Sequence, residues 1–479
     1  MSETAPPVPW WARWTDWTRL LPAHVKDQSV RIGRILLLGF VLRILLLPLF
    51  AGTDATSTAW ISTVLMAKGQ LILSNDPPPI FYIHALTFEM FRPILPATIL
   101  GRFTSSVAFT PSTFLQESVL SEPGIAVFLS LLKLPYLVFD LATAILLLWV
   151  IREKGAAVRV SKLWLFNPVV LYATYFVGQF DIVAVFFVVL AFYYNQQGRR
   201  TSTLVALALA ILFKVFAVVI VPFFLFQWLE ANRGLLARAK SFVTIAVASA
   251  APFALQFLIL IVQPVFYESA NLVLTGNVNG FYGTQIYNRG AAANPLLQGF
   301  LTFVGYSAKL PTVSPIPDVF YLLPIAYLIF LVRWVTLRGK DDAKLWNATA
   351  VVFLLVYAFG LFHVQWFLWV QPFLLVLVTR EGKRFSYLYA GIVILFFVYT
   401  WRWDDLLTTV LLVPSVPGAA NWPGPITFMN RAGLPAELIL DIARTMFSAL
   451  CLALAFLCLR KDWVPAWVRD RWIRRRTPA

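Results

Sequence analysis

The sequence predicts an all-α integral membrane protein. Hydrophobic residues make up 59% of the 479-residue chain and charged residues only 13%, about half the charged share of an ordinary soluble domain. The mean hydropathy is +0.75. Apolar runs such as residues 127–150 and 242–262 are long enough to cross about 30 Å of hydrocarbon as helices. The sequence lacks the alternating pattern of transmembrane β-strands, so the predicted spans are helices.

The basic residues lie between the apolar runs, and this position explains the net charge of +16. Lysine and arginine accumulate in loops that stay in the cytoplasm. The pattern therefore predicts anionic membrane lipids as partners, and no nucleic acid. It also predicts a multi-pass protein of the cell membrane with both termini in the cytoplasm. The basic clusters are Arg31 and Arg34, Arg152–Lys162, Arg199 and Arg200, Arg233–Lys240, Arg338–Lys344, Arg380–Arg384, and the tail from Arg460 to Arg476.

These loops divide the chain into a cytoplasmic N-terminal segment (1–33), a single polytopic membrane domain (34–460) and a basic cytoplasmic tail (461–479). The membrane domain is expected to hold about 11–12 transmembrane or half-span helices. Long external loops are expected at 51–123, 266–315 and 402–437. The predicted spans are 34–50, 124–151, 163–177, 181–197, a pair within 203–228, 241–265, 316–337, 345–362, 364–379, 385–401 and 438–460.

Residues 203–228 are the one predicted crossing that departs from a simple helix. Both flanks are basic, so the segment must leave the cytoplasm and return to it, yet it is too short for two full crossings. We expect two short helices that meet near Lys214 and face the protein interior. The alternative, a single crossing, would place Arg233, Arg238 and Lys240 outside and invert every later loop.

The first external loop is far longer than an ordinary connection. It is expected to contain two amphipathic helices, at Ala59–Ser74 and Ile80–Phe91, separated by the prolines Pro77–Pro79 and lying along the outer membrane surface. Because long structured loops commonly carry function, any chemistry is expected at the external face.

Polar motifs occur at the ends of the predicted spans. In chain order they are Gly52-Thr53-Asp54, Lys133-x-Pro135 with Asp140, Asn167-Pro168, Gly178-Gln179-Phe180-Asp181, Phe213-Lys214 with Pro222, and His363-Val364-Gln365-Trp366 with Pro372. This series resembles the GT-C superfamily of polytopic glycosyltransferases that use lipid-phosphate-linked sugars. It is most similar to prokaryotic relatives of the GPI and dolichyl-phosphate-mannose-dependent mannosyltransferases. The best match covers Lys162–Pro222, with weaker similarity as far as the region of Leu375.

In that family an acidic residue of the first external loop is the usual catalytic base, and the resemblance assigns this role to Asp54. A carboxylate can take the proton of an acceptor hydroxyl, and a single displacement at the anomeric carbon inverts its configuration. Family members often carry a second acid or a tyrosine close behind, whereas Ala55–Thr58 follow here. This departure weakens the case for a metal site at Asp54. No cofactor is predicted as a firm requirement, and dependence on a divalent metal is left open. The alternative is that Asp54 only ends a helix in solvent.

The resemblance also implies substrate-binding residues at two later motifs. Gln179 and Asp181 would line the active-site cavity, with Asp181 orienting hydroxyls of the sugar or the acceptor. His363 would touch the phosphate or the acceptor, accompanied by Gln365 and by the stacking surface of Trp366. The alternatives are a tight turn in which Asp181 caps the next helix, and an interfacial aromatic belt.

Three further residues are candidates for substrate binding. Lys214, at the break of the helix pair, is expected to contact the carrier phosphate, with a structural ion pair as the alternative. The resemblance implies that Arg289, in the stretch "YGTQIYNRGAAANP", stabilises the departing phosphate. Asp76, just before Pro77–Pro79, is expected to start a turn, with a catalytic role as the minor alternative.

Three other ionisable residues within apolar runs are assigned mainly to structure. Asp140 is expected to pair with Arg43, since a charge in a span needs a partner. Lys133 is expected to extend its ammonium group toward the external interface.

Cys451 and Cys458 are expected to be packing residues in the last span.

The predicted function is therefore an inverting glycosyltransferase at the external membrane face. It would move a sugar, mannose by resemblance, from a polyprenyl-phosphate donor to a lipid, glycan or protein acceptor. The competing interpretation is a transporter or flippase of lipid-linked saccharides, which would also use broken helices and intramembrane charges. Transporters usually show internal repeats, and none is evident in the sequence.

Overall fold

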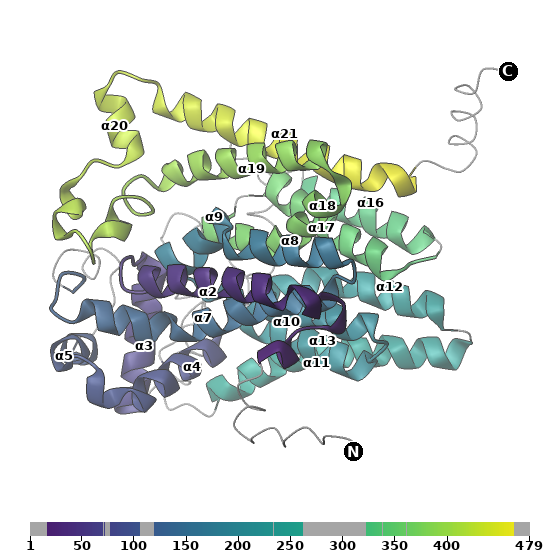
Figure 1. Cartoon of the computed structure of the whole chain (residues 1–479), viewed down its shortest axis with the longest axis horizontal. Helices are drawn as coiled ribbons and strands as arrows, with labels where there is room; N and C mark the ends of the chain where they lie inside the picture. Colours follow the sequence, from purple (N-terminus) through teal and green to yellow (C-terminus); the bar gives the residue numbers. More distant parts are fainter. Residues whose placement is uncertain are drawn as a thin grey trace, which may run out of the picture.

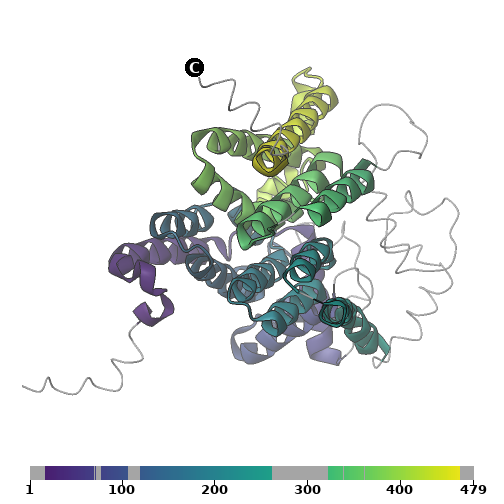
Figure 2. The ribbon, with the colours of Figure 1, turned by 90° about the vertical axis from the view of Figure 1, so that its right-hand side faces the viewer.

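The computed structural model describes residues 17–69, 71, 77–105, 119–232, 234–261, 322–337, 339–360 and 362–463. The regular structure of these residues is helical throughout, and they contain no strand. Most helices lie roughly along the long axis of the molecule (Figure 1). Viewed from the side (Figure 2), the first half of the chain, purple to teal, packs against the second half, green to yellow.

Five of the described helices are long and apolar enough to cross a bilayer. This confirms the coarse prediction of an all-helical membrane protein. Each of the five overlaps a predicted span. They are α7 (Ile125–Val150), α13 (Leu235–Ile261), α17 (Asp342–Phe359), α19 (Lys383–Thr400) and α21 (Ala436–Trp463).

Shorter helices surround these five. The N-terminal part contains η1 (Trp17–Leu20), η2 (Ala23–Gln28) and α2 (Ser29–Leu46), and η3 (Arg92–Ile94) follows later. α10 (Asp181–Gln196) and α16 (Leu322–Thr336) correspond to predicted spans. Between α19 and α21 the chain forms η7 (Trp401–Trp403), η8 (Val410–Leu412), η9 (Pro417–Asn421) and α20 (Pro425–Arg431).

The region predicted as one span at 163–177 is instead divided at Asn167. α8 (Lys154–Leu165) ends before it, and α9 (Pro168–Leu171) and the π-helical turn η4 (Tyr172–Phe176) follow. The side chain of Asn167 accepts hydrogen bonds from the backbone of two following residues and so caps α9, and a proline at the first helical position needs no backbone partner. A capping residue followed by proline therefore starts a new helix here.

The predicted pair of short helices within 203–228 is present. α11 (Arg200–Phe213) ends at Lys214, whose backbone is extended with φ −160° and ψ 123°. The chain then returns through η5 (Val215–Ile220) and α12 (Val221–Ala231). Nη1 of Arg200, where α11 starts, donates to Oδ1 of Asn232, just after α12, over 3.0 Å. The segment therefore leaves one end of the bundle and comes back to it.

A second broken helical hairpin has the same design. α17 is followed by an extended residue, His363, and then by η6 (Val364–Val370) and α18 (Gln371–Glu381), which has a proline in its first turn. The two hairpins touch through their 3₁₀ segments, because the rings of Phe216 and Trp369 stack with centroids 3.9 Å apart.

Polar contacts between loops show that the described basic clusters gather at one end of the bundle. Arg152 donates to the backbone oxygen of Gln196 over 3.3 Å, and Asn195 donates to Asp342 over 2.7 Å. The other links between these loops are the ion pairs Lys154–Asp27, Arg380–Glu153 and Lys340–Glu230.

The segment after α2 has helices at both predicted stretches, but the first of them differs from the prediction in its start and its burial. It forms α3 (Thr53–Lys68), α4 (Pro78–Met90) and α5 (Ala97–Ser105), of which α4 and α5 pack against α3. They lie at the lower left in Figure 1, and α20 lies at the upper left. α3 starts earlier than expected and is buried along most of its length. Its polar side chains do not form a solvated face, because Ser62 and Thr63 are buried and donate to backbone oxygens one turn earlier.

The predicted pairing of Asp140 with Arg43 is confirmed. Nε of Arg43 lies 2.6 Å from Oδ2 of Asp140, and both side chains are fully buried. Tyr175 donates to the same carboxylate over 2.9 Å and Trp164 over 2.7 Å. The pair therefore joins α2, α7, α8 and η4 through charge-assisted hydrogen bonds in the interior.

The structural role assigned to Lys133 is confirmed, but its side chain does not extend toward the interface. The side chain is fully buried. Its ammonium group donates to the backbone oxygens of Leu47, Phe50 and Tyr175. A buried ammonium group needs a hydrogen-bond acceptor for each of its three protons. Through these acceptors Lys133 fixes the end of α2 against the end of η4. Both ends lead directly into the candidate site.

Candidate functional site

Four chain reversals meet at the end of the bundle opposite the basic loops. They are the α2–α3 connection, the η4–α10 turn, the break at Lys214 and the break at His363. The first two are joined by a backbone hydrogen bond of 3.1 Å from Gly52 to Val177. The other two lie beside them, because Asp54 contacts Gln365 and Asp181 contacts Trp369, both just after the break at His363. Asp181 also contacts Lys214 at its own break. The predicted motif residues, although far apart in sequence, therefore share one place.

Asp54 is the centre of this site. It lies in the first turn of α3 and is partly exposed; the amino end of a helix favours a carboxylate. Its Oδ2 accepts hydrogen bonds from Nε2 of Gln179 over 2.5 Å and from Nε2 of Gln365 over 3.1 Å. Both glutamines are buried. Two amides from different hairpins thus hold the carboxylate in one orientation.

Asp181 is the second carboxylate of the site, but it does not cap α10 as the alternative interpretation expected. It is the first residue of that helix, and the preceding residue makes no side-chain cap. Its fully buried carboxylate accepts a hydrogen bond of 2.5 Å from Nε1 of Trp369. The ammonium of Lys214 lies 3.7 Å from its other oxygen.

Lys214 therefore has the ion pair that the structural interpretation predicted. Its ammonium also lies 4.4 Å from the centroid of the Phe180 ring, a distance at which a cation is attracted to the ring face. The side chain keeps 14% of its surface exposed, whereas Asp181 keeps none. The cation is thus held from one side by a buried carboxylate and remains partly accessible.

An aromatic wall extends from the buried to the exposed part of the site. Trp369 stacks on Phe216, as described above, and on Trp366 at 5.1 Å with an angle of 19° between the planes. The ring of His363 lies 5.2 Å from that of Trp366, and His363 is exposed. His363 therefore lies at the rim of the site.

Two glycines allow the reversals to approach each other. Gly178 has φ +78°, and a Cβ atom there would lie 2.8 Å from Cβ of Ala55. A Cβ atom on Gly52 would lie 2.7 Å from the backbone oxygen of Val177. Gly178 therefore requires glycine for both its left-handed backbone and its close approach, and Gly52 for its close approach alone. Together they bring Gln179 within reach of Asp54.

The structure brings together most, but not all, of the residues predicted from the sequence. Asp54 contacts Gln179 and Gln365 directly, and Asp181 contacts Lys214 and Trp369. The two groups are adjacent because Gln365 and Trp369 both lie on η6. Asp76 and Arg289 lie outside the described residues. Among the described residues, no group of three or more His, Cys, Asp or Glu is placed to share a metal ion.

Sequence reasoning missed two residues that complete the site. The sequence offered Trp369 only as part of the alternative aromatic belt, but it is buried and donates to Asp181. Phe216 forms the other face of its stack. The one sequence signal for these contacts is that both aromatic residues follow a predicted helix break by a few positions and precede a proline.

No protein-family model matches the chain, and no curated protein matches it.

Proposed function

We propose that the chain is an inverting GT-C-type glycosyltransferase. It moves a sugar, with mannose expected, from a polyprenyl-phosphate donor to a lipid, glycan or protein acceptor at the external membrane face. The observation that carries the proposal is the orientation of one partly exposed carboxylate, Asp54, by Gln179 and Gln365. A proton-accepting group needs such a fixed position beside the reacting hydroxyl.

In the proposed reaction Asp54 takes the proton of the acceptor hydroxyl. As that oxygen forms its bond to the anomeric carbon, the bond between this carbon and the phosphate oxygen breaks. The polyprenyl phosphate leaves with the bonding electrons, and the configuration at the carbon inverts. The departing phosphate is a weak base, so no protein acid is required to protonate it.

Lys214 is the described residue best suited to the carrier phosphate. Its ammonium has three protons and remains partly exposed beside Asp181. Because Asp181 is fully buried and bound by Trp369, its proposed role shifts from orienting sugar hydroxyls to positioning Lys214. Arg289 and His363 remain candidates for contact with the phosphate or the acceptor.

The orientation in the membrane is part of the proposal. The basic loops lie at one end of the bundle and the cluster around Asp54 at the other. If the basic end is cytoplasmic, as such loops usually are, the cluster faces the exterior. Lipid-linked donors would then approach from the outer leaflet, and the N- and C-terminal segments would lie in the cytoplasm.

Purified full-length protein incubated with polyprenyl-phosphate-mannose and candidate acceptors tests the proposal. Release of polyprenyl phosphate and formation of glycosylated acceptor are measured for the wild type, Asp54→Asn and Glu437→Gln. Glu437 is an exposed carboxylate in the first turn of α21 and serves as the matched control. We expect Asp54→Asn to lower turnover by about 10²–10⁴-fold, while the control keeps it.

Two outcomes would contradict the proposal. Turnover that survives in Asp54→Asn would remove this residue as the base. Binding of the donor without any turnover, together with movement of the lipid-linked sugar across vesicle membranes, would favour the transporter.

A further inference from the structure

A buried arginine near the start of α21 has no direct contact with the cluster around Asp54. Arg444 keeps only 2% of its surface exposed. Within the described ranges no carboxylate forms an ion pair with it, and Asp441, one turn earlier on α21, pairs with Arg402 at 3.3 Å. A buried charge in an apolar helix is costly, so the guanidinium group depends on partners of another kind.

The end of α17 supplies the first of these partners. Nη1 of Arg444 donates to the backbone oxygen of Tyr357 over 2.8 Å, and Nη2 donates to the backbone oxygen of Gly360. These residues belong to the last turn and the C-cap of α17. Backbone oxygens at the end of a helix lack partners within it and carry a partial negative charge. Arg444 therefore caps α17 from a neighbouring helix.

An aromatic cage surrounds the same guanidinium group. The rings of Phe362, Tyr399 and Phe447 lie 5.1, 5.2 and 5.5 Å from its central carbon, distances at which ring faces attract a cation. The hydroxyl of Tyr399, near the end of α19, also donates to the backbone oxygen of Phe362 over 3.3 Å. Carbonyl oxygens and ring faces thus balance the charge of Arg444, and they do so only while the end of α17 stays in this place.

Tyr357 extends this clamp into η6. Its backbone oxygen accepts from Arg444, and its hydroxyl donates to the backbone oxygen of Trp366. The backbone nitrogen of Trp366 in turn donates to the oxygen of His363 over 2.9 Å, which closes the first turn of η6. Backbone oxygens on both sides of the break at His363 are therefore tied to one buried cluster.

We propose that Arg444 is a positioning residue for the transfer, an inference that rests on the proposed role of Asp54 as the base. Arg444 fixes the end of α17 and, through Tyr357, the first turn of η6. Gln365 lies in that turn, and its amide holds Asp54 over 3.1 Å. Without the clamp η6 can shift, and a misplacement of about 1 Å can lower a rate about 100-fold.

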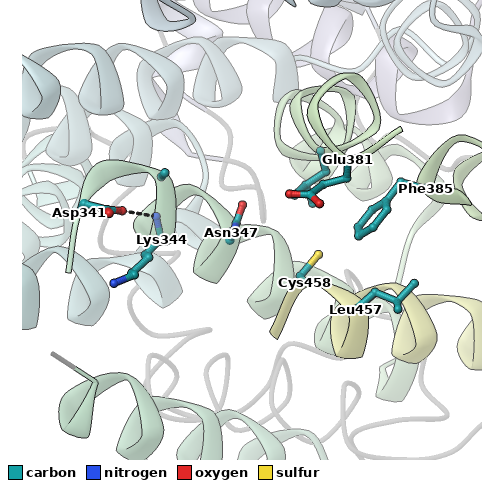
Figure 3. A pocket seen from close by; sticks show the side chains of 9 residues that line it. Asp341, Lys344, Asn347, Glu381, Phe385, Leu457 and Cys458 are labelled. Carbon is teal, nitrogen blue, oxygen red and sulfur yellow. Dashed lines mark hydrogen bonds between the residues drawn. The ribbon is translucent and has the colours of Figure 1, made fainter. Parts of the chain in front are cut away.

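α17 and α21 also meet at the basic end of the bundle, and this end provides a matched control. There they border, with α18 and α19, a cavity of about 190 Å³. Figure 3 shows Asn347 on α17 and Cys458 on α21 among the side chains that line it. Leu454 is fully buried one turn before Cys458, about 15 Å along α21 from Arg444. Leu454→Ala should therefore destabilise α21 without disturbing the break at His363.

Steady-state kinetics of the full-length wild type, Arg444→Met, Arg444→Lys and Leu454→Ala test the proposal. We expect Arg444→Met to lower kcat about 100-fold, with a change in the donor KM of less than about threefold. Arg444→Lys keeps a cation that can donate to backbone oxygens and should retain more of kcat. Leu454→Ala should keep kcat below its melting temperature. Unchanged kcat in Arg444→Met, or an equal fall in Leu454→Ala, would overturn the proposal.

A double-variant cycle shows whether Arg444 acts through η6 and Gln365. In a Gln365→Leu background the amide that Arg444 positions is already absent, so Arg444→Met should lower kcat by a smaller factor than in the wild type. Effects that multiply fully would show that Arg444 acts by another route and would overturn the proposal.

Hydrogen exchange measured by mass spectrometry tests the clamp without relying on turnover. Tyr357→Phe removes only the hydroxyl contact with Trp366 and serves if Arg444→Met does not fold; its kcat should fall about three- to tenfold, the effect of one hydrogen bond. In either variant, exchange should rise at residues 362–370 and stay unchanged at 342–350 and 452–459. A uniform rise, or none, would overturn the proposal. Absence of transfer in the wild type would instead contradict the role of Asp54 and leave the exchange result standing.

Discussion

Nε2 of Gln179 donates to Oδ2 of Asp54 over 2.5 Å, although 125 residues separate them in the chain. Gln365, from another hairpin, donates to the same oxygen. The two amides come from different segments, the turn between η4 and α10 and the 3₁₀ helix η6. The geometry of Asp54 therefore depends on the correct docking of three chain reversals.

Replacing Gln365 should reduce catalysis more than it reduces substrate binding. Gln365→Leu removes one of the two described amide donors to Asp54, so we expect kcat to fall roughly 10- to 100-fold with a smaller change in KM. Combining it with Gln179→Leu should cost less than the sum of the single effects, because both act on one carboxylate. Steady-state kinetics of the two single variants and the double variant measure this, and strictly additive effects would contradict a shared role.

Lys214 should act on the donor substrate. Lys214→Gln removes the partly exposed cation beside Asp181, so we expect KM for the polyprenyl-phosphate donor to rise about tenfold. Lys214→Arg keeps the charge and should retain more of the affinity. Kinetics at varied donor concentration, with the acceptor saturating, separate the two variants. An effect confined to the acceptor KM would assign Lys214 to the other substrate.

Gly178 should tolerate substitution less well than Gly198, a glycine that also has a positive φ angle. Gly178→Ala places a Cβ atom 2.8 Å from Cβ of Ala55 at φ +78°. Gly198→Ala, at φ +70°, meets no atom within 4 Å and should lose only the roughly 1–2 kcal/mol of a left-handed alanine. Thermal unfolding in detergent should show the lower midpoint for Gly178→Ala, and equal midpoints would show that the close approach is unimportant.

The buried pair of Arg43 and Asp140 should be costly to break. Arg43→Met leaves a fully buried carboxylate without its cation, so we expect a loss of about 3–5 kcal/mol. Arg43→Met combined with Asp140→Leu should recover part of it. Lys154→Met, which breaks the exposed contact with Asp27, should cost less than about 1 kcal/mol. Denaturant unfolding compares the variants, and a smaller loss for Arg43→Met than for Lys154→Met would contradict the prediction.

His84 should make the fold sensitive to acid. It lies in α4, outside the five long apolar helices, and its Nε2 lies 3.0 Å from the Tyr136 hydroxyl. Burial lowers the pKa of His84 from 6.5 to about 3, because the charged imidazolium loses its hydration. The unfolded chain therefore binds more protons between these values. Stability is fully present above pH 6.5 and falls below it by up to about 1.4 kcal/mol per pH unit.

Unfolding of the wild type and of His84→Gln at pH 7.5 and pH 5 measures this dependence. The wild type should lose more stability than the variant between the two values. Equal losses would show that other groups cause the acid sensitivity.

Periodicity and charge in the sequence were sufficient for the helical class and for the positions of the five helices that are long and apolar enough to cross a bilayer. They also predicted the break at Lys214, because two basic flanks and a short apolar segment leave few other solutions. The pairing of Asp140 with Arg43 was predictable since buried charges in a span require partners. The resemblance directed attention to Asp54 and Gln179, but it did not imply that one donates to the other.

Only the tertiary structure decided how these groups act on each other. From the sequence, the Lys133 ammonium was expected at the external interface, whereas it lies in the interior because three backbone oxygens converge there. It could not show that Trp369 holds Asp181 and that Asp181 holds Lys214, since these contacts join residues on different hairpins. Local patterns determine which segments are helices and which end at a break. Contacts between distant segments, set by packing and by the need of buried polar groups for partners, determine which carboxylate remains accessible for chemistry.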